Sequence, residues 1–504
     1  LKIFKYNQAS GITSLDPAFA KNQANIWAVS QLFNGLVQLD SNMNIVPCIA
    51  KKWNFSEDAL TITFILRDDV YFHENELFEN KKRVVNAQDF VYSFNRIIDK
   101  QAASPGAWIF NGKVAGNEPF KALNDTVFQL NLKEPFAPIL GILTMPYCFV
   151  VPKEIIDFYG RDFRAHPVGT GAFKFKIWEE GIALVALKNN NYFEQDSKGV
   201  LLPYLDGFKV TFNESKKMEY LNFMKGNLDM LSGVDKSFVK EIFTEEATLQ
   251  KKWQNNIKLY KAPFLNTEYL GINLETNNKW LSQKKFRQAL NYCFSKEEMI
   301  QYFRNGIGFP AVNGFIPKNL PPNTGNYLNG YNYNLEKAKQ LLKEIDYNGD
   351  EIVLNTNETY KDIGLYIANQ AEKAGVKIKI EVVQPSLLRE WMVSGEVDFF
   401  RGSWIADYPD AENYLSLFYS KNGAPPNYTR FKNDTFDLYY EQAKKSFDVQ
   451  EQMNLYTKMD SIIIEEAPVV FLYYDELIRL THENIFGAKP NAFNNLDLKI
   501  VKKK

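Results

Sequence analysis

At 504 residues the chain is too long for one compact core, and a mean of about 150 residues per domain predicts about three domains. Apolar residues make up 45% and charged residues 24%, as in ordinary globular proteins. The net charge of −1 argues against a nucleic-acid partner, because phosphate binding needs a basic stripe. Aromatic residues are abundant at 15%, and they can fill cores or line an apolar cleft that binds a ligand.

The cysteines are too few, and odd in number, for a disulfide framework: Cys48, Cys148 and Cys293. A single Cys48–Cys148 bridge and three buried thiols both fit this count, and we favour buried thiols. The first residues, LKIFKYNQAS, lack the basic and apolar segments of a signal peptide. The chain is therefore expected to be either cytosolic or a mature, trimmed form.

The first half of the chain predicts short strands and one well-marked helix. Alternate apolar residues predict a strand in residues 61–72: Ile62, Phe64 and Leu66. Asn86 and Asp89 form the capping pair of a helix whose apolar positions recur at helical spacing: Phe90, Phe94, Ile97 and Ile98. Further strands are expected at 3–6 and 127–133, and residues 167–178 are expected to form a turn that opens into a strand. The uncharged run 135–151 is interrupted or bounded by prolines, so it is expected to be loop and strand rather than a membrane span.

After residue 250 the pattern changes to alternating strands and helices, which predicts an α/β domain from about residue 265 to about residue 470. Strands are expected at 268–274, 351–357, 376–383, 398–404 and 467–480. Two helices are expected behind the caps Ser282 and Asn334, and a third over 360–375, where Gly375 ends it. The first two have these apolar stripes: Phe286, Ala289, Leu290 and Cys293, then Leu335, Ala338, Leu341 and Leu342.

Few residues predict chemistry. No zinc-site spacing is present, because the three histidines lie far from one another and from the cysteines: His73, His166 and His482. No serine lies in a nucleophile elbow, and no phosphate-binding Gly-Lys-Ser/Thr loop is present. The exception is WIADYPDAENY (404–414), which places three acids among aromatic residues: Asp407, Asp410 and Glu412.

Carboxylates beside aromatic rings can be the acid pair of a glycoside hydrolase, a metal site or the anchor of a cationic ligand. Asp410 and Glu412 follow a turn-like proline and are expected to be solvated or to cap a helix. Asp407 closes an apolar strand, at the carboxyl end where α/β sheets bind ligands, and Arg401 lies six residues upstream. From the residues alone, two interpretations are equally supported. Arg401 and Asp407 can belong to a ligand site, or they can pair with neighbouring side chains inside the protein.

The segment HPVGTGAFKFKIW (166–178) resembles the N-P-V-G-T-G-P-Y/F motif of bacterial extracellular solute-binding protein family 5, the oligopeptide- and dipeptide-binding proteins of ABC importers. His166 stands where that motif commonly has Asn. Other segments that resemble the family follow in the family's order: SLDPAFA (14–20), LFNGLV (32–37), VVNAQDFVYSFNRI (84–97), EPFAPIL (134–140), YLGINLE (269–275), FRQALNYCFSKEEMI (286–300), NLEKAKQLL (334–342), SWIADYPDAENYLSLFYS (403–420) and NYTRFKNDTFD (427–437).

The resemblance implies an α/β fold of the periplasmic-binding-protein-like type II (cluster C), with two main lobes and a smaller inserted domain. Lobe I would be discontinuous and formed by residues 1–42, 166–262 and 472–504. Residues 43–165 would form the inserted domain II, and residues 263–471 would form lobe III, the α/β lobe that binds ligand. Two hinge strands, within 263–272 and 467–476, would connect lobes I and III, which close on the ligand.

The resemblance also implies five ligand-binding residues: Asp407, Trp404, Arg401, Tyr269 and Asn427. In family members the aspartate at the place of Asp407 accepts the α-ammonium group of a peptide. An ionised carboxylate suits this three-donor cation, and such a charge-assisted bond contributes about 1.5–3 kcal/mol. Trp404 would form a wall of the site, and Arg401 resembles an arginine that binds the peptide carboxylate in some members. Tyr269 and Asn427 complete the set.

The expected function is that of a non-enzymatic, extracytoplasmic solute-binding protein that traps short peptides and delivers them to the permease subunits of an ABC importer. It would act as a monomer, without cofactor or metal, at the periplasmic or extracellular face of the cytoplasmic membrane. Any membrane contact would be through a lipid anchor outside the given sequence. One alternative keeps the fold and changes the cargo to an oligosaccharide, a nickel complex, haem or an opine. The other is a glycoside hydrolase with two carboxyl groups about 5–9.5 Å apart.

Overall fold

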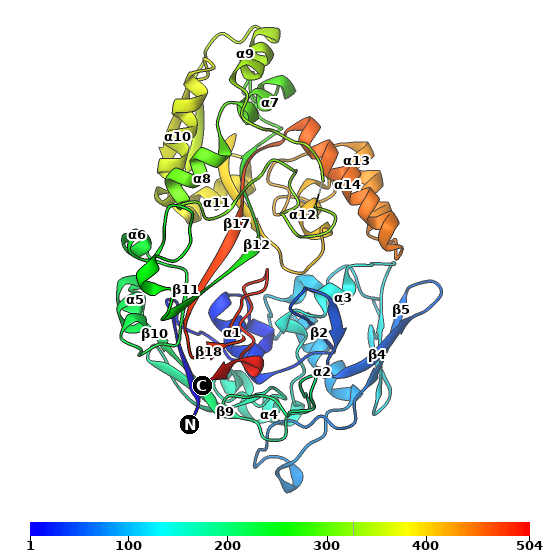
Figure 1. The fold of residues 1–504 in the computed structure, drawn as a ribbon. Helices are drawn as coiled ribbons and strands as arrows, with labels where there is room; N and C mark the ends of the chain where they lie inside the picture. The colour runs from blue at the N-terminus through cyan, green and yellow to red at the C-terminus, as the bar shows by residue number, and fades with distance from the viewer. Residues whose placement is uncertain (326) are drawn as a thin grey trace. The chain divides into compact units, whose positions relative to one another are not determined.

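The structure is a computed structural model that describes residues 1–325 and 327–504, and the chain forms two compact units (Figure 1). Unit 1 comprises residues 1–243, 249–262 and 477–504, and unit 2 comprises residues 244–248 and 263–476. One unit boundary lies after residue 262, where a lobe boundary is expected; the other lies after residue 476 rather than 471. Unit 1 contains both the expected lobe I and the expected domain II, so their separation stays a prediction.

Unit 1 contains two four-stranded sheets. The first has the strand order β1 (Ile3–Gln8), β10 (Gly207–Phe212), β9 (Ala183–Lys188) and β8 (Phe173–Glu179). In this sheet β1 pairs parallel with β10, whereas the other neighbours are antiparallel. Helix α1 (Gln23–Leu32) contacts β8. The strand predicted to open from the turn at 167–172 is therefore an edge strand of this sheet.

The second sheet is antiparallel and lies within the expected domain II. Its strand order is β4 (Ala50–Phe55), β5 (Thr61–Leu66), β7 (Val127–Asn131) and β6 (Phe120–Asn124). Helix α2 (Ala87–Ile98) covers it, and the rings of Phe90 and Phe94 contact Phe128 of β7. The helix begins with the predicted capping box, because Asn86 and Asp89 each accept the other's backbone N–H.

The remaining helices and strands of unit 1 are short: β2 (Val37–Leu39), β3 (Ile45–Pro47), α3 (Ile139–Ile142), α4 (Lys153–Tyr159), α5 (Lys216–Met224), β11 (Met230–Ser232), α6 (Val239–Ile242), β18 (Ile485–Phe486) and β19 (Lys502–Lys503). The run 135–151 contains α3 and no strand, so the prediction of a strand there is wrong. Pro138 occupies the N-cap of α3, a position that needs no backbone N–H, and a short helix can therefore follow it.

Unit 2 is built on a mixed sheet. Its main strands follow the order β17 (Val469–His482), β12 (Ile257–Ile272), β16 (Phe399–Ile405), β14 (Ile352–Thr356) and β15 (Ile378–Val382), and β13 (Phe309–Pro310) pairs with β17. β12 pairs antiparallel with β16, whereas β14 pairs parallel with both β15 and β16. The long neighbours β12 and β17 each pass from one unit into the other (Figure 1), and their role as hinge strands stays a prediction.

Eight helices, counted within the described residues, accompany the unit 2 sheet: α7 (Lys284–Tyr292), α8 (Lys296–Arg304), α9 (Leu335–Glu344), α10 (Lys361–Glu372), α11 (Pro385–Ser394), α12 (Glu412–Leu415), α13 (Asp434–Ala443) and α14 (Val449–Glu466). Helices α7 to α10 share one apolar core with Phe399, whereas α11 shares another with Phe400. Since neighbouring strand residues point to opposite faces, β16 separates the two cores.

Two details of the predicted helices differ in the structure. Asn334 caps α9 as predicted, but the cap of α7 is Gln283, and the prediction of Ser282 is wrong. The Ser282 hydroxyl instead donates to the carbonyl of Lys279 in the preceding turn (3.1 Å). Helix α10 ends at Glu372, three residues before Gly375, whose φ of 92° then reverses the chain.

The three cysteines are free and buried, as favoured, so the Cys48–Cys148 bridge is absent. Within residues 1–325 and 327–504, no helix combines the length and apolarity needed to cross a membrane.

Candidate functional site

The order of the parallel strands places a candidate site at one edge of the unit 2 sheet. The chain runs from β14 through α10 to β15, then through α11 to β16, and β15 and β16 flank β14 on opposite sides. At such a reversal of strand order, α/β proteins commonly bind ligands beside the carboxyl ends of the two strands. The carboxyl end of β16 leads directly into the stretch 404–414, which holds Asp407.

Asp407 has an exposed side chain that no basic group of the described residues neutralises. Its backbone N–H donates to Asn413 Oδ1 (3.1 Å), and its Oδ2 accepts a long bond from Asn413 Nδ2 (3.4 Å). The carboxylate reaches solvent, yet surrounding protein atoms displace part of its water. This partial burial raises the pKa of Asp407, against the opposing effect of the Asn413 bond.

Asn413 is a residue that the sequence argument missed. It lies in α12 and is 4% exposed, and its Oδ1 accepts a second hydrogen bond from the Trp404 indole (2.9 Å). One amide therefore fixes both Trp404 and Asp407 relative to α12. Its signal in the sequence is its place in the same aromatic stretch, where the neighbouring carboxylates are the residues that predict chemistry.

The other two acids of the stretch turn inward. Glu412 is 4% exposed and accepts hydrogen bonds from the hydroxyls of Tyr408 and Tyr440, so the expectation that it is solvated is wrong. Asp410 accepts the backbone N–H of Glu412 (2.9 Å) and the hydroxyl of Tyr456 in α14 (2.7 Å), but the N-cap of α12 is Ala411, so Asp410 is not the expected helix cap. Burial raises the pKa of Asp410 to about 7. These bonds anchor the stretch to α13 and α14.

Arg401 forms an ion pair inside unit 2. Its Nε lies 3.1 Å from Glu268 Oε2, and its Nη2 lies 2.7 and 2.6 Å from the two carboxylate oxygens. Its guanidinium also stacks over the ring of Tyr360 at 3.6 Å. Glu268 is 2% exposed; burial raises its pKa, and the charge of Arg401 opposes that rise. The internal pairing that the sequence left open is thus observed for Arg401 but not for Asp407.

Tyr269 occupies a core position in β12. Only 2% of its surface is exposed, and its ring packs against Phe315 at 5.1 Å. A Cβ atom at Gly402 of the neighbouring β16 would lie 2.6 Å from the Tyr269 ring, which shows how closely the backbone approaches it.

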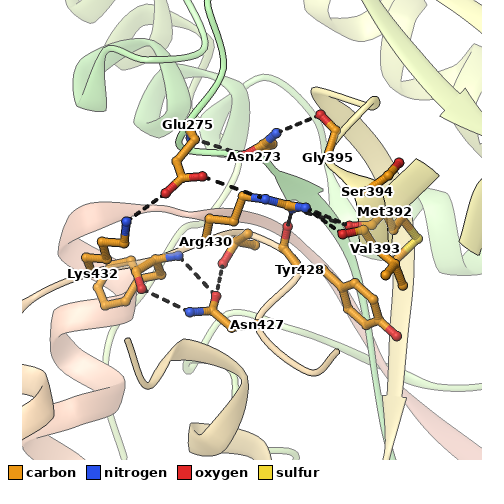
Figure 2. Close-up of polar contacts among 12 residues, drawn as sticks. Asn273, Glu275, Met392, Val393, Ser394, Gly395, Asn427, Tyr428, Arg430 and Lys432 are labelled. Carbon is orange, nitrogen blue, oxygen red and sulfur yellow. Dashed lines mark hydrogen bonds and ion pairs between the residues drawn. The ribbon is translucent and has the colours of Figure 1, made fainter. Parts of the chain in front are cut away.

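Asn427 organises a loop (Figure 2). It is 3% exposed, its Nδ2 donates to the carbonyls of Tyr419 (3.3 Å) and Phe431 (3.0 Å), and its Oδ1 accepts the Phe431 N–H (3.0 Å). The same loop carries Arg430, whose guanidinium donates to the carbonyls of Met392 and Val393 at the end of α11. A cation there complements the negative end of the helix dipole.

The structure therefore brings Asp407 and Trp404 together through Asn413, and it holds Arg401 against Glu268. Tyr269 and Asn427 are buried and contact other groups of the protein. Ligand contact by the five residues stays a prediction.

Two cavities, of about 310 and 270 Å³, are lined by other residues: one by Asn433, Ser461 and Glu465 among others, and one by His73, His166 and Lys174 among others. Among the described residues no three metal-ligating side chains form a metal site.

Comparison with known proteins places the whole chain among transport proteins. The family model "Bacterial extracellular solute-binding proteins, family 5 Middle" matches residues 44–426. The glutathione-binding protein GsiB of Salmonella typhimurium is 26% identical over 520 residues, which cover 97% of this chain and 93% of that protein.

Solved structures share the fold of this chain. The periplasmic binding protein DppA from Helicobacter pylori, in complex with the peptide STSA, is 26% identical with a TM-score of 0.78 and coverage of 99% and 98%. HbpA2 from Haemophilus parasuis, 24% identical, has the same fold over 100% of both chains, with a TM-score of 0.85.

These similarities confirm the predicted fold class and remove the hydrolase alternative, while the cargo named for relatives differs from protein to protein. The chain is a non-enzymatic substrate-binding protein of an ABC importer and works outside the cytoplasm. It belongs to the bacterial extracellular solute-binding proteins of family 5.

Proposed function

We propose that the protein binds solutes with a primary ammonium group, short peptides above all, and delivers them to the permease of its importer. The observation that carries this proposal is the exposed carboxylate of Asp407, which no basic side chain of the described residues neutralises. An ionised carboxylate only accepts hydrogen bonds, so it suits an ammonium group, which only donates them. A partly desolvated anion also gains more from a cation than a fully hydrated one does.

Trp404 supports this proposal as an apolar wall beside the carboxylate. Its indole N–H is already used by Asn413, so the ring face is the part that remains for a ligand. We assign Tyr269 and Asn427 to the support of the site, because both are buried and Asn427 is bonded within the protein. An uncharged sugar would leave Asp407 without a counter-charge, which disfavours that cargo.

The proposal predicts that Asp407→Asn weakens the binding of peptides with a free amino terminus by about tenfold or more, since a charge-assisted bond of about 1.5–3 kcal/mol is lost. Peptides with an acetylated amino terminus should lose little. Calorimetric titration of both peptides against both proteins measures this difference. Glu351→Gln is a matched control, because Glu351 is an exposed acid just before β14, at the opposite end of that strand from the site. Equal affinity of parent and Asp407→Asn for the free-amine peptide would remove Asp407 from the site.

A further inference from the structure

Two arginines of unit 2 are each paired with a carboxylate of the sheet's strands. Arg401 is held by Glu268 through three short contacts. Arg304, in α8, forms an ion pair with Asp475 of β17 and donates to the Tyr473 hydroxyl (3.0 Å). Together the four charges cancel.

Asn266 connects these two pairs into one cluster. Its Nδ2 lies 3.1 Å from Glu268 Oε1 and 3.4 Å from Asp475 Oδ2. Glu268 is shielded from solvent as well as paired, because its side chain is 2% exposed, whereas that of Asp475 is 21% exposed. Within this cluster each arginine is therefore matched by a carboxylate, whereas Asp407, farther along the chain after β16, has no basic partner among the described residues.

A solute carboxylate would find little attraction at Arg401. Two donor atoms of the guanidinium, Nε and Nη2, already point at Glu268, and one face of the group is covered by the ring of Tyr360. An incoming anion would also meet the negative charge of Glu268 beside the positive charge it approaches, so attraction and repulsion nearly cancel. This arrangement differs from the carboxylate-binding arginine that the family resemblance suggested.

We propose, on the basis of the function proposed above, that Glu268 is a specificity-determining residue. By neutralising Arg401 it makes the unit 2 site bind the ammonium group of a solute without binding its carboxylate. The substrate class then includes amines whose carboxyl end is amidated, extended or absent, as well as free acids.

The test compares trialanine with trialanine amide, which differ only at the carboxyl end. The native protein should bind both with affinities within about threefold of each other. Glu268→Gln releases the charge of Arg401, so this variant should bind the free acid about tenfold more tightly than the amide. Glu275→Gln is the matched control: Glu275 pairs with Arg430 and Lys432 elsewhere in unit 2 (Figure 2), and its removal should leave the ratio unchanged.

If the native protein already binds the free acid about tenfold more tightly than the amide, the proposal is overturned. This measurement uses the native protein alone, so it does not depend on whether a variant folds. A folded Glu268→Gln variant that gains no preference overturns it too. The double variant Glu268→Gln/Arg401→Met removes both charges of the buried pair and should return the ratio to the native value. Asp407→Asn distinguishes failure of the proposed function from failure of this inference. That variant tests how the amino end of the solute is bound, whereas Glu268→Gln tests how the carboxyl end is bound.

Discussion

The amide of Asn413 holds three groups at once: the indole N–H of Trp404, the backbone N–H of Asp407 and the Asp407 carboxylate. A side chain fixed in this way loses little conformational entropy when a ligand binds, and a preorganised site gains affinity. The same amide donates to the carboxylate and so lowers the pKa of Asp407, against the rise caused by burial. Asn413 is thus expected to act on the ligand through Asp407.

We predict that Asn413→Leu weakens the binding of peptides with a free amino terminus by about tenfold, since each lost hydrogen bond contributes about 0.5–1.5 kcal/mol. Loss of the amide donor also raises the pKa of Asp407 further, and the ammonium group binds only the ionised carboxylate. Affinity should therefore decline at a higher pH than in the parent when solutions are acidified. Calorimetric titrations between about pH 8 and about pH 4 measure both effects. An unchanged pH midpoint would mean that Asn413 supports only the fold.

Helix α14 shows how elements outside the sheet support the site. Its Tyr456 holds Asp410, and one turn later its Asp460 accepts the backbone N–H groups of Phe315 (2.7 Å) and Ile316 (3.2 Å). Asp460 is completely buried, and burial raises its pKa to about 7. The helix is therefore attached to the rest of unit 2 through acids that are costly to ionise.

This arrangement predicts a pH-dependent stability. The pKa of Asp460 in the folded protein lies above that of an unfolded aspartate. The contribution of Asp460 to the free energy of unfolding is therefore complete below about pH 4 and is lost as the pH rises through about 7. The loss should amount to about 2–4 kcal/mol. Urea unfolding of the parent and of Asp460→Asn at several pH values measures it. The variant should show a flatter dependence over this range, and identical slopes would contradict the assignment.

Local signals in the sequence predicted many elements but few of their contacts. The capping pair Asn86 and Asp89 and the cap Asn334 were predicted correctly, because a cap depends on neighbours within a few residues. Glu268 and Arg401 are 133 residues apart, and their pairing depends on the alignment of β12 with β16. No local pattern encodes that alignment, so the sequence could mark Arg401 as a candidate without revealing its partner.

At the scale of the whole molecule, β12 and β17 are strands that both units share. A strand that continues through a unit boundary ties the two units by backbone, and the resemblance to hinged binding proteins implies that ligand closes the lobes.

We predict that saturating trialanine reduces the radius of gyration measured by small-angle X-ray scattering, since a closed form buries surface of both lobes around the ligand. Asp407→Asn at the same peptide concentration should show less of this change. Scattering curves that coincide with and without a tightly bound peptide would contradict closure.

The three native thiols have a practical consequence for such measurements. All are enclosed by protein, and burial raises the pKa of each, to about 12 for Cys48 and Cys293. Maleimides react with the thiolate, which these residues scarcely form at neutral pH. A dye pair attached to two newly introduced surface cysteines, one per unit, would therefore report on opening and closing without prior removal of the native ones.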